Sequence, residues 1–168
     1  LVKLRNGIWR NMGGCLAPMN AYLNIIGMET LGLRMERVCN NAFRLAQALE
    51  KLEGVSVNYP LLESSPYHEL AEKQLSGKGG AILTIRAGSK ERAYKLINHL
   101  KYVKIATNIG DVRTLVIHPA STIYIHSTPE AMAEAGVYDD TIRISVGIED
   151  IKDLIKDFTE AVESLGEE

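Results

Sequence analysis

The stretch Thr141–Val146, which reads TIRISV, decides the fold because apolar and polar side chains alternate along it. Alternation with a period of two residues is the pattern of a β-strand with one buried face. Ile142 and Ile144 fall on one face of this strand, whereas Arg143 and Ser145 fall on the other. The sequence therefore predicts a sheet with one apolar face for helices and one face that presents a guanidinium.

The segments around this strand supply those helices. From Glu29 to Leu52, apolar residues recur at steps of three and four, which predicts a long amphipathic helix. A second such helix is predicted from Asp150 to Leu165, with acidic residues at its positive N-terminal end. Further strands are predicted at Val55–Tyr59, Ala81–Ile85, Tyr102–Ala106 and Thr114–Ile117, and further helices at Leu16–Ile26, His68–Leu75, Ser89–Leu100 and Thr128–Ala135. These elements indicate an α/β or α+β fold, with one sheet and helices packed on it.

Composition excludes several classes of function. The chain has 168 residues, the size of about one domain, and its net charge of −2 offers no basic excess for nucleic acid or an acidic membrane. No apolar run approaches the ~20 residues of a membrane span, and no secretory signal is recognisable. The two cysteines, Cys15 and Cys39, and four scattered histidines match no disulfide framework and no metal site. We expect a cytoplasmic protein with reduced thiols and without metal, nucleic-acid or membrane partners.

Arg143 is the strongest candidate for a binding residue, because a planar guanidinium can grip a carboxylate with two parallel hydrogen bonds. A salt bridge at the surface or between domains is the alternative interpretation, and the spacing alone does not exclude it. Two loops are weaker candidates. Asn108–Asp111 lies between two predicted strands and could bind a polar ligand, but Asn, Gly and Asp are also ordinary turn residues. His118–Thr122 could likewise be a site loop or simply the end of a strand.

Several motifs resemble those of the PLP-dependent enzymes of Cys/Met metabolism. Gly14–Leu23 is similar to the G-x-x-S-P-F-N-A-x-L segment of that family, with Ala17 in place of the usual Ser and Met19 in place of the usual Phe. The resemblance extends from about Arg10 to Val162. It continues in order through Gly27–Leu31, Arg34–Arg37, Asn41–Ala42, Val57–Pro60, Asn108–Asp111, Thr114–Thr122 and Ile142–Asp150.

This resemblance implies the small C-terminal domain of a fold-type I PLP-dependent transferase. Residues 1–26 would connect to a missing large domain, and residues 27–168 would form the domain that binds the substrate carboxylate. In the family, pyridoxal 5'-phosphate is bound mainly by the large domain, which also carries the lysine that anchors it. The resemblance thus implies no catalytic and no cofactor-binding residue in this chain. It implies substrate binding for Arg143, at the position of the family arginine that holds the α-carboxylate, and for Asn108 beside it.

Within the family, the chain is most similar to the O-acetylhomoserine sulfhydrylases, because their turn is typically Asn-x-Gly-Asp, as at Asn108. This similarity implies that sulfide replaces the acetate of O-acetylhomoserine to give homocysteine, in methionine biosynthesis. It also implies a homo-oligomer, a tetramer in the family, and an inactive protein when this chain is alone. Methionine γ-lyase, cystathionine γ-synthase and a non-catalytic binding or assembly module remain the alternatives.

Overall fold

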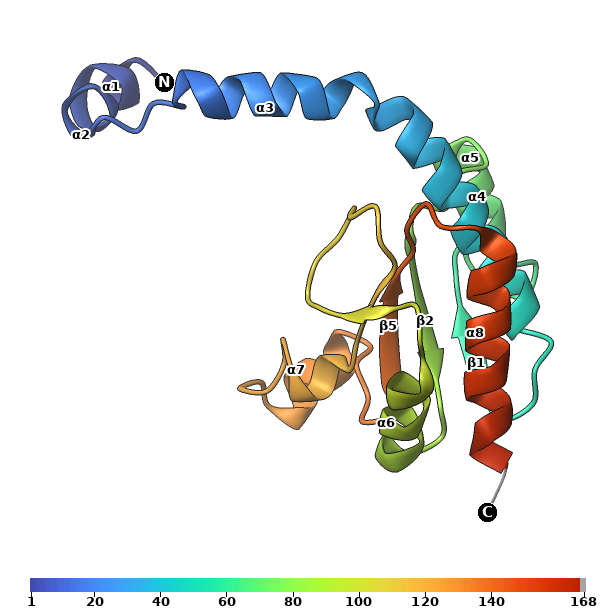
Figure 1. Cartoon of the computed structure of the whole chain (residues 1–168). Coiled ribbons are helices and arrows are strands. Elements are labelled where there is room, and N and C mark those ends of the chain that lie inside the picture. The colour runs from blue at the N-terminus through green and yellow to red at the C-terminus, as the bar shows by residue number, and fades with distance from the viewer. Residues whose placement is uncertain (167–168) are drawn as a thin grey trace. The chain divides into compact units, whose positions relative to one another are not determined.

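The structure is a computed structural model that describes residues 1–166, in two compact units, Leu1–Leu33 and the residues from Arg34 onward (Figure 1). The second unit contains the sheet and the hydrophobic core. None of the helices within residues 1–166 combines the length and the apolar character needed to cross a membrane.

The first unit is helical and has no buried residue. Its elements are α1 (Val2–Leu4), the π-helical turn η1 (Arg5–Trp9), α2 (Arg10–Met12) and α3 (Pro18–Glu29). The predicted helix at Leu16–Ile26 is confirmed as α3, with Pro18 in its first turn. Gly27 does not interrupt this helix, which continues to Glu29, because a glycine within a helix costs only about 1 kcal/mol. The short helices before α3 were not predicted, since no apolar period marks them.

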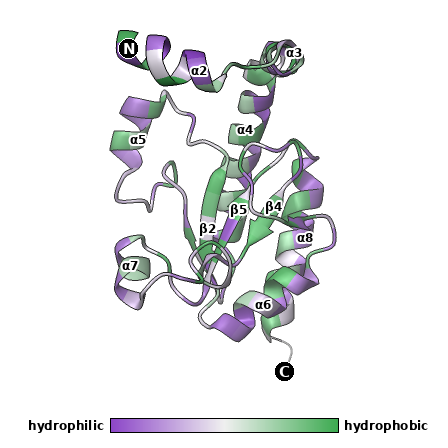
Figure 2. Ribbon diagram, turned by 90° about the vertical axis from the view of Figure 1, so that its left-hand side faces the viewer, coloured by the Kyte–Doolittle hydropathy of each residue, from purple (hydrophilic) through white to green (hydrophobic). Residues whose placement is uncertain are grey.

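The second unit is built on a five-stranded sheet of order β1-β2-β5-β4-β3. The strands are β1 (Ser56–Asn58), β2 (Ile82–Arg86), β3 (Lys104–Ile105), β4 (Leu115–Ile117) and β5 (Thr141–Ser145). The pairing is antiparallel throughout, except that β3 and β4 are parallel. Figure 2 shows β2, β5 and β4 side by side, so the strand predicted from TIRISV is the central one. The edge strands are shorter than predicted, and both residues of β3 are exposed.

Helices cover one face of this sheet and form the core with it. They are α4 (Leu31–Leu49), α6 (Lys90–His99) and α8 (Ile151–Glu163), whose apolar stripes pack in one cluster with Leu83, Ile85, Val116, Ile142 and Ile144 of the strands. The remaining elements are α5 (His68–Leu75), η2 (Pro119–Ser121), α7 (Pro129–Glu134) and η3 (Ser164–Gly166). Ile142 and Ile144 are fully buried against the helices, as predicted. The other face of the strand is not open, however, because Thr141 and Ser145 are buried too and only Arg143 is partly exposed.

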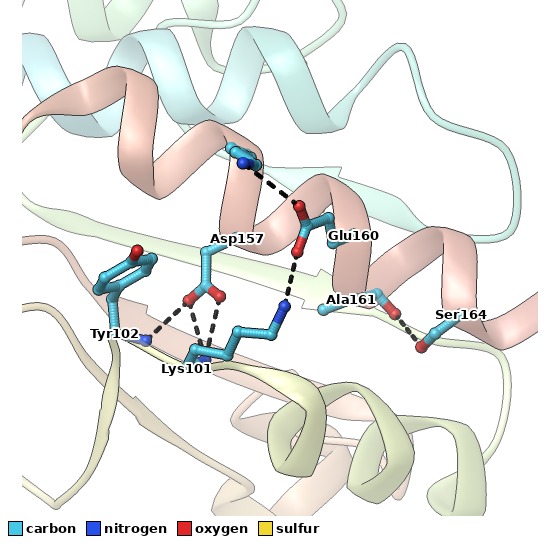
Figure 3. Close-up of polar contacts among 7 residues, drawn as sticks. Lys101, Tyr102, Asp157, Glu160, Ala161 and Ser164 are labelled. Atoms are coloured by element: carbon cyan, nitrogen blue, oxygen red, sulfur yellow. Dashed lines mark hydrogen bonds and ion pairs between the residues drawn. The ribbon is translucent and has the colours of Figure 1, made fainter.

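A buried carboxylate fixes α8 to the chain that leads into β3 (Figure 3). Asp157 is only 2% exposed, and its oxygens accept hydrogen bonds from the backbone N–H of Lys101, at 3.0 and 3.2 Å, and of Tyr102, at 3.1 Å. One turn further along α8, Glu160 forms an ion pair with Lys101 Nζ at 2.8 Å, on the exposed side. The start of β3 is therefore held in place by polar contacts rather than by a long ladder.

Candidate functional site

Arg143 occupies the middle of the central strand, on the face of the sheet that the core helices leave uncovered. Across the sheet it lies opposite Thr84 of β2 and Ile117 of β4. Its side chain is half-buried. The sequence analysis predicted that the guanidinium lies on this face. The structure confirms it, because the side chains of Ile142 and Ile144 are buried on the opposite face of the same strand.

The structure brings Arg143 and Asn108 together, although 35 residues separate them. Nη2 of Arg143 donates a hydrogen bond to the main-chain carbonyl of Asn108 at 3.1 Å. The side-chain oxygen of Asn108 accepts from the N–H of Ile109 at 2.9 Å, a contact within the loop itself. Asn108 itself is exposed. Contact between the two predicted site residues thus runs through the backbone of Asn108 and leaves its amide group at the surface.

Two polar groups on this face lack partners. Nε of Arg143 and Oγ of Ser145 are buried, and neither makes a hydrogen bond to any described residue. A buried donor without an acceptor costs about 1–3 kcal/mol. In addition, no carboxylate within residues 1–166 forms an ion pair with Arg143. The salt-bridge interpretation therefore finds no partner for Arg143 within residues 1–166.

Further polar residues, to which the sequence analysis gave no role although they lie in the quoted family motifs, hold the loop that carries Asn108. The carboxylate of Glu149 accepts from the N–H of Thr114 at 2.5 Å and from its hydroxyl at 2.8 Å. Asn41 of α4 donates from its side chain to the carbonyls of Gly147 and Glu149, at 3.0 and 2.9 Å. One signal could have revealed this site, since Asn41 is a polar residue within the apolar stripe of a helix and is only 1% exposed.

The second candidate loop has a structural explanation. His118 is 4% exposed, and its Nδ1 lies 2.8 Å from the hydroxyl of Ser121. Its Nε2 lies 2.6 Å from the carbonyl of Asp139, which can only accept, so Nε2 donates. The ring also packs edge-on against Tyr94, with the centroids 4.9 Å apart. Both ring nitrogens are engaged within the fold, so His118 anchors the end of β4 and offers no free group to a ligand.

Comparisons with known proteins agree with these motifs. The model of the "Cys/Met metabolism PLP-dependent enzyme" family matches residues 2–163. O-acetyl-L-homoserine sulfhydrylase 1 of Thermus thermophilus is 43% identical over 164 residues, which are 96% of this chain and 39% of that protein. Homocysteine synthase of Schizosaccharomyces pombe is 46% identical over 156 residues, which are 92% of this chain and 36% of that protein. The chain thus spans less than half the length of these relatives.

A solved structure is similar over the same extent. A crystal structure from Campylobacter jejuni that contains N'-pyridoxyl-lysine-5'-monophosphate matches with a TM-score of 0.90 and 35% identity. The match covers 96% of this chain and 39% of that one. The predicted fold class is therefore confirmed in a structure that holds a pyridoxyl group on a lysine.

Proposed function

The chain belongs to the Cys/Met metabolism PLP-dependent enzyme family, and from that premise we propose that it is the C-terminal, substrate-binding part of an O-acetylhomoserine sulfhydrylase. In the proposed reaction, sulfide replaces the acetyl-oxy group of O-acetylhomoserine, and homocysteine and acetate leave. The identity of 43% to a protein named O-acetyl-L-homoserine sulfhydrylase 1 supports this choice of substrate, and the identity of 46% to a protein named homocysteine synthase supports this product.

One observation carries the proposal, namely that Arg143 is a half-buried guanidinium without a carboxylate partner among the described residues. The carbonyl of Asn108 takes one of its five N–H groups, and the buried Nε has no acceptor. A cation in this situation favours an anionic ligand with two oxygens in one plane. The α-carboxylate of an amino acid has this geometry, and we assign to Arg143 and Asn108 the role of fixing it.

The proposed reaction requires pyridoxal 5'-phosphate, and we propose that this cofactor is held mainly outside the present chain. Pyridoxal 5'-phosphate supplies an electron sink that stabilises carbanions formed on the amino acid. We assign its lysine anchor and its other ligands to a larger preceding domain. The residues of this chain would bind the substrate by its carboxylate and so orient the reacting carbons, which is a contribution through positioning.

The arrangement of the rest of the enzyme is part of the same proposal. We assign residues 1–26 to a connection with the large domain and residues 27–168 to the carboxylate-binding domain. The large apolar side chains of residues 1–26, Trp9, Tyr22, Leu23 and Ile26 among them, are all exposed, which supports the role of this segment as a connection. The compact unit that contains it extends further, to Leu33. Exposed apolar surface of this kind marks an interface. We further propose a cytoplasmic homo-oligomer, in keeping with the two free cysteines.

The test is an assay of the complete enzyme with O-acetylhomoserine and sulfide, in which homocysteine and acetate are measured. We expect equal amounts of both products, formed only when both substrates are present. Three other outcomes would replace the proposal. Release of methanethiol from methionine would indicate a γ-lyase, and cystathionine formed with cysteine would indicate a cystathionine γ-synthase. Pyridoxal phosphate binding or assembly without any turnover would indicate a non-catalytic module.

A further inference from the structure

We propose that Thr114, Glu149 and Asn41 are positioning residues that set the place of the Arg143 guanidinium without touching the substrate. The inference deepens the proposed function and rests on it where substrate binding is concerned. It starts from the loop between β3 and β4, residues 106–113, because the carbonyl of Asn108 in this loop accepts a hydrogen bond from Arg143. Whatever holds the loop therefore determines where that acceptor lies.

Both ends of the loop are tied to the sheet. At the start, the N–H of Ala106 donates to the carbonyl of Val116 at 3.3 Å. At the end, the carbonyl of Val112 accepts from the N–H of Ile148, just after β5, at 2.9 Å. The residue before Ile148 must be a glycine, because a Cβ at Gly147 would lie 2.4 Å from the Val112 carbonyl oxygen. The close approach of these two backbones fixes the end of the loop over the turn that follows β5.

Thr114 and Glu149 hold this crossing together. The hydroxyl of Thr114 accepts from the N–H of Gly147 at 2.9 Å and donates to Oε2 of Glu149 at 2.8 Å, while Oε1 accepts from the N–H of Thr114. The buried hydroxyl of Thr114, the first residue after the loop, thus contacts the turn after β5 twice, at the backbone of Gly147 and at the carboxylate of Glu149. Thr114 is fully buried, so it cannot reach a ligand at the surface.

Asn41 extends this set of contacts to the longest helix. Its side-chain amide donates to the carbonyls of Gly147 and Glu149, and Nη2 of Arg37 donates to the carbonyl of Glu149 at 3.2 Å. The turn is therefore held from α4 on one side and from Thr114 on the other. Hydrogen bonds run from α4 through the turn to Thr114 and Val112 at the end of the loop. From there the backbone of the loop leads to Asn108, whose carbonyl accepts from Arg143.

The decisive comparison uses Thr114→Val, which keeps the shape of the side chain and removes the hydroxyl, and Thr114→Ser, which keeps the hydroxyl. In the ¹⁵N-labelled chain, we expect Thr114→Val to speed exchange of the Gly147 amide about tenfold, because this N–H loses the hydroxyl that accepts its hydrogen bond. We also expect it to shift the side-chain Nε–H resonance of Arg143, identified as the signal missing from Arg143→Lys. Thr114→Ser should restore both values. Asn41→Ala provides a second route to the same effects, should Thr114→Val not fold.

In the complete enzyme, Thr114→Val should raise KM for the amino-acid substrate about tenfold and leave kcat within about twofold. In an Arg143→Lys background, Thr114→Val should raise KM little further, because the oriented hydrogen bond from Arg143 to the substrate carboxylate is already lost. An unchanged Arg143 resonance, or additive losses in the double variant, would overturn the positioning role. A different outcome is also informative. If Thr114→Val shifts the Nε–H resonance of Arg143 but Arg143 variants do not alter substrate binding, the proposed function is refuted and the positioning role is retained.

Discussion

A guanidinium offers N–H donors in a fixed plane, and this geometry distinguishes arginine from lysine at position 143. In the complete enzyme, Arg143→Lys keeps the charge but removes one of two oriented bonds to the carboxylate. A charge-assisted bond contributes about 1.5–3 kcal/mol, so we expect kcat/KM to fall roughly ten- to a hundredfold. The absorbance of bound pyridoxal phosphate should not change.

The stability of this variant separates binding from structure. Arg143 lies on the face opposite the core helices, and the buried Nε–H that the lysine variant lacks has no acceptor within residues 1–166, so we expect the free energy of unfolding to change by only about 0.5 kcal/mol. Arg44→Lys, on an exposed position of α4, is the matched control and should leave kcat/KM unaltered. Unchanged kinetics in Arg143→Lys, or a loss that follows unfolding, would show that Arg143 is a structural residue.

At the scale of elements, the junction between α8 and the start of β3 depends on one buried charge. Asp157→Asn replaces a carboxylate oxygen that accepts backbone hydrogen bonds with an amide that cannot accept. We expect a loss of about 1–3 kcal/mol in the free energy of unfolding, measured by urea denaturation. Asp153→Asn, the same exchange at an exposed position of the same helix, should cost less than about 1 kcal/mol. Equal losses in both variants would mean that the buried contacts contribute nothing.

The ion pair beside this junction predicts a dependence on pH. The hydrogen bond and charge of Lys101 lower the pKa of Glu160 below its ordinary value of 4.5, and Glu160 raises the pKa of Lys101 above 10.5. Stabilisation by the pair is therefore lost as pH falls through the folded-state pKa of Glu160, and again as pH rises through that of Lys101. The melting temperature of Glu160→Gln should lie slightly below that of the wild type at neutral pH and low salt. The two should converge at both extremes of pH and in high salt.

At the scale of the whole molecule, the second unit contains all the buried residues and the first contains none. Every buried residue lies at Val38 or beyond, so a chain that starts at Arg34 should fold by itself. We expect its melting temperature to lie within about 3 °C of that of the full chain. Sedimentation velocity should show concentration-dependent association of the full chain and a monomer for the shortened one, because the exposed apolar helices are gone.

A variant at full length tests the same idea. Leu23→Glu places a charge on the exposed apolar surface of α3 and should reduce association without lowering the melting temperature. A full chain that stays monomeric at all concentrations, or a shortened chain that does not fold, would contradict the division into two units.

The sequence predicted the elements whose patterns are local. The alternation at Ile142 and Ile144 identified the central strand, and the stripes of α4 and α8 identified the helices that cover it. Local patterns could not predict the contact between Arg143 and Asn108, because strand order and loop path are set by pairings between distant residues. Only the resemblance to the family placed Asn108 beside Arg143. The role of Asn41 escaped for the same reason, since its partners lie 106 and 108 residues away. Motif order across the chain, rather than spacing, indicated the family.

The order of strands has a consequence for synthesis of the protein. Of the five strands of this sheet, β5 is synthesised after the other four, yet it separates β2 from β4 in the finished sheet. Until β5 emerges, the nascent chain holds two unjoined pairs, β1 with β2 and β3 with β4, each with an open edge. Such edges are sites of mispairing and aggregation during translation. Completion of the sheet, and with it the delivery of Arg143 to its loop, must therefore wait until synthesis has passed residue 145.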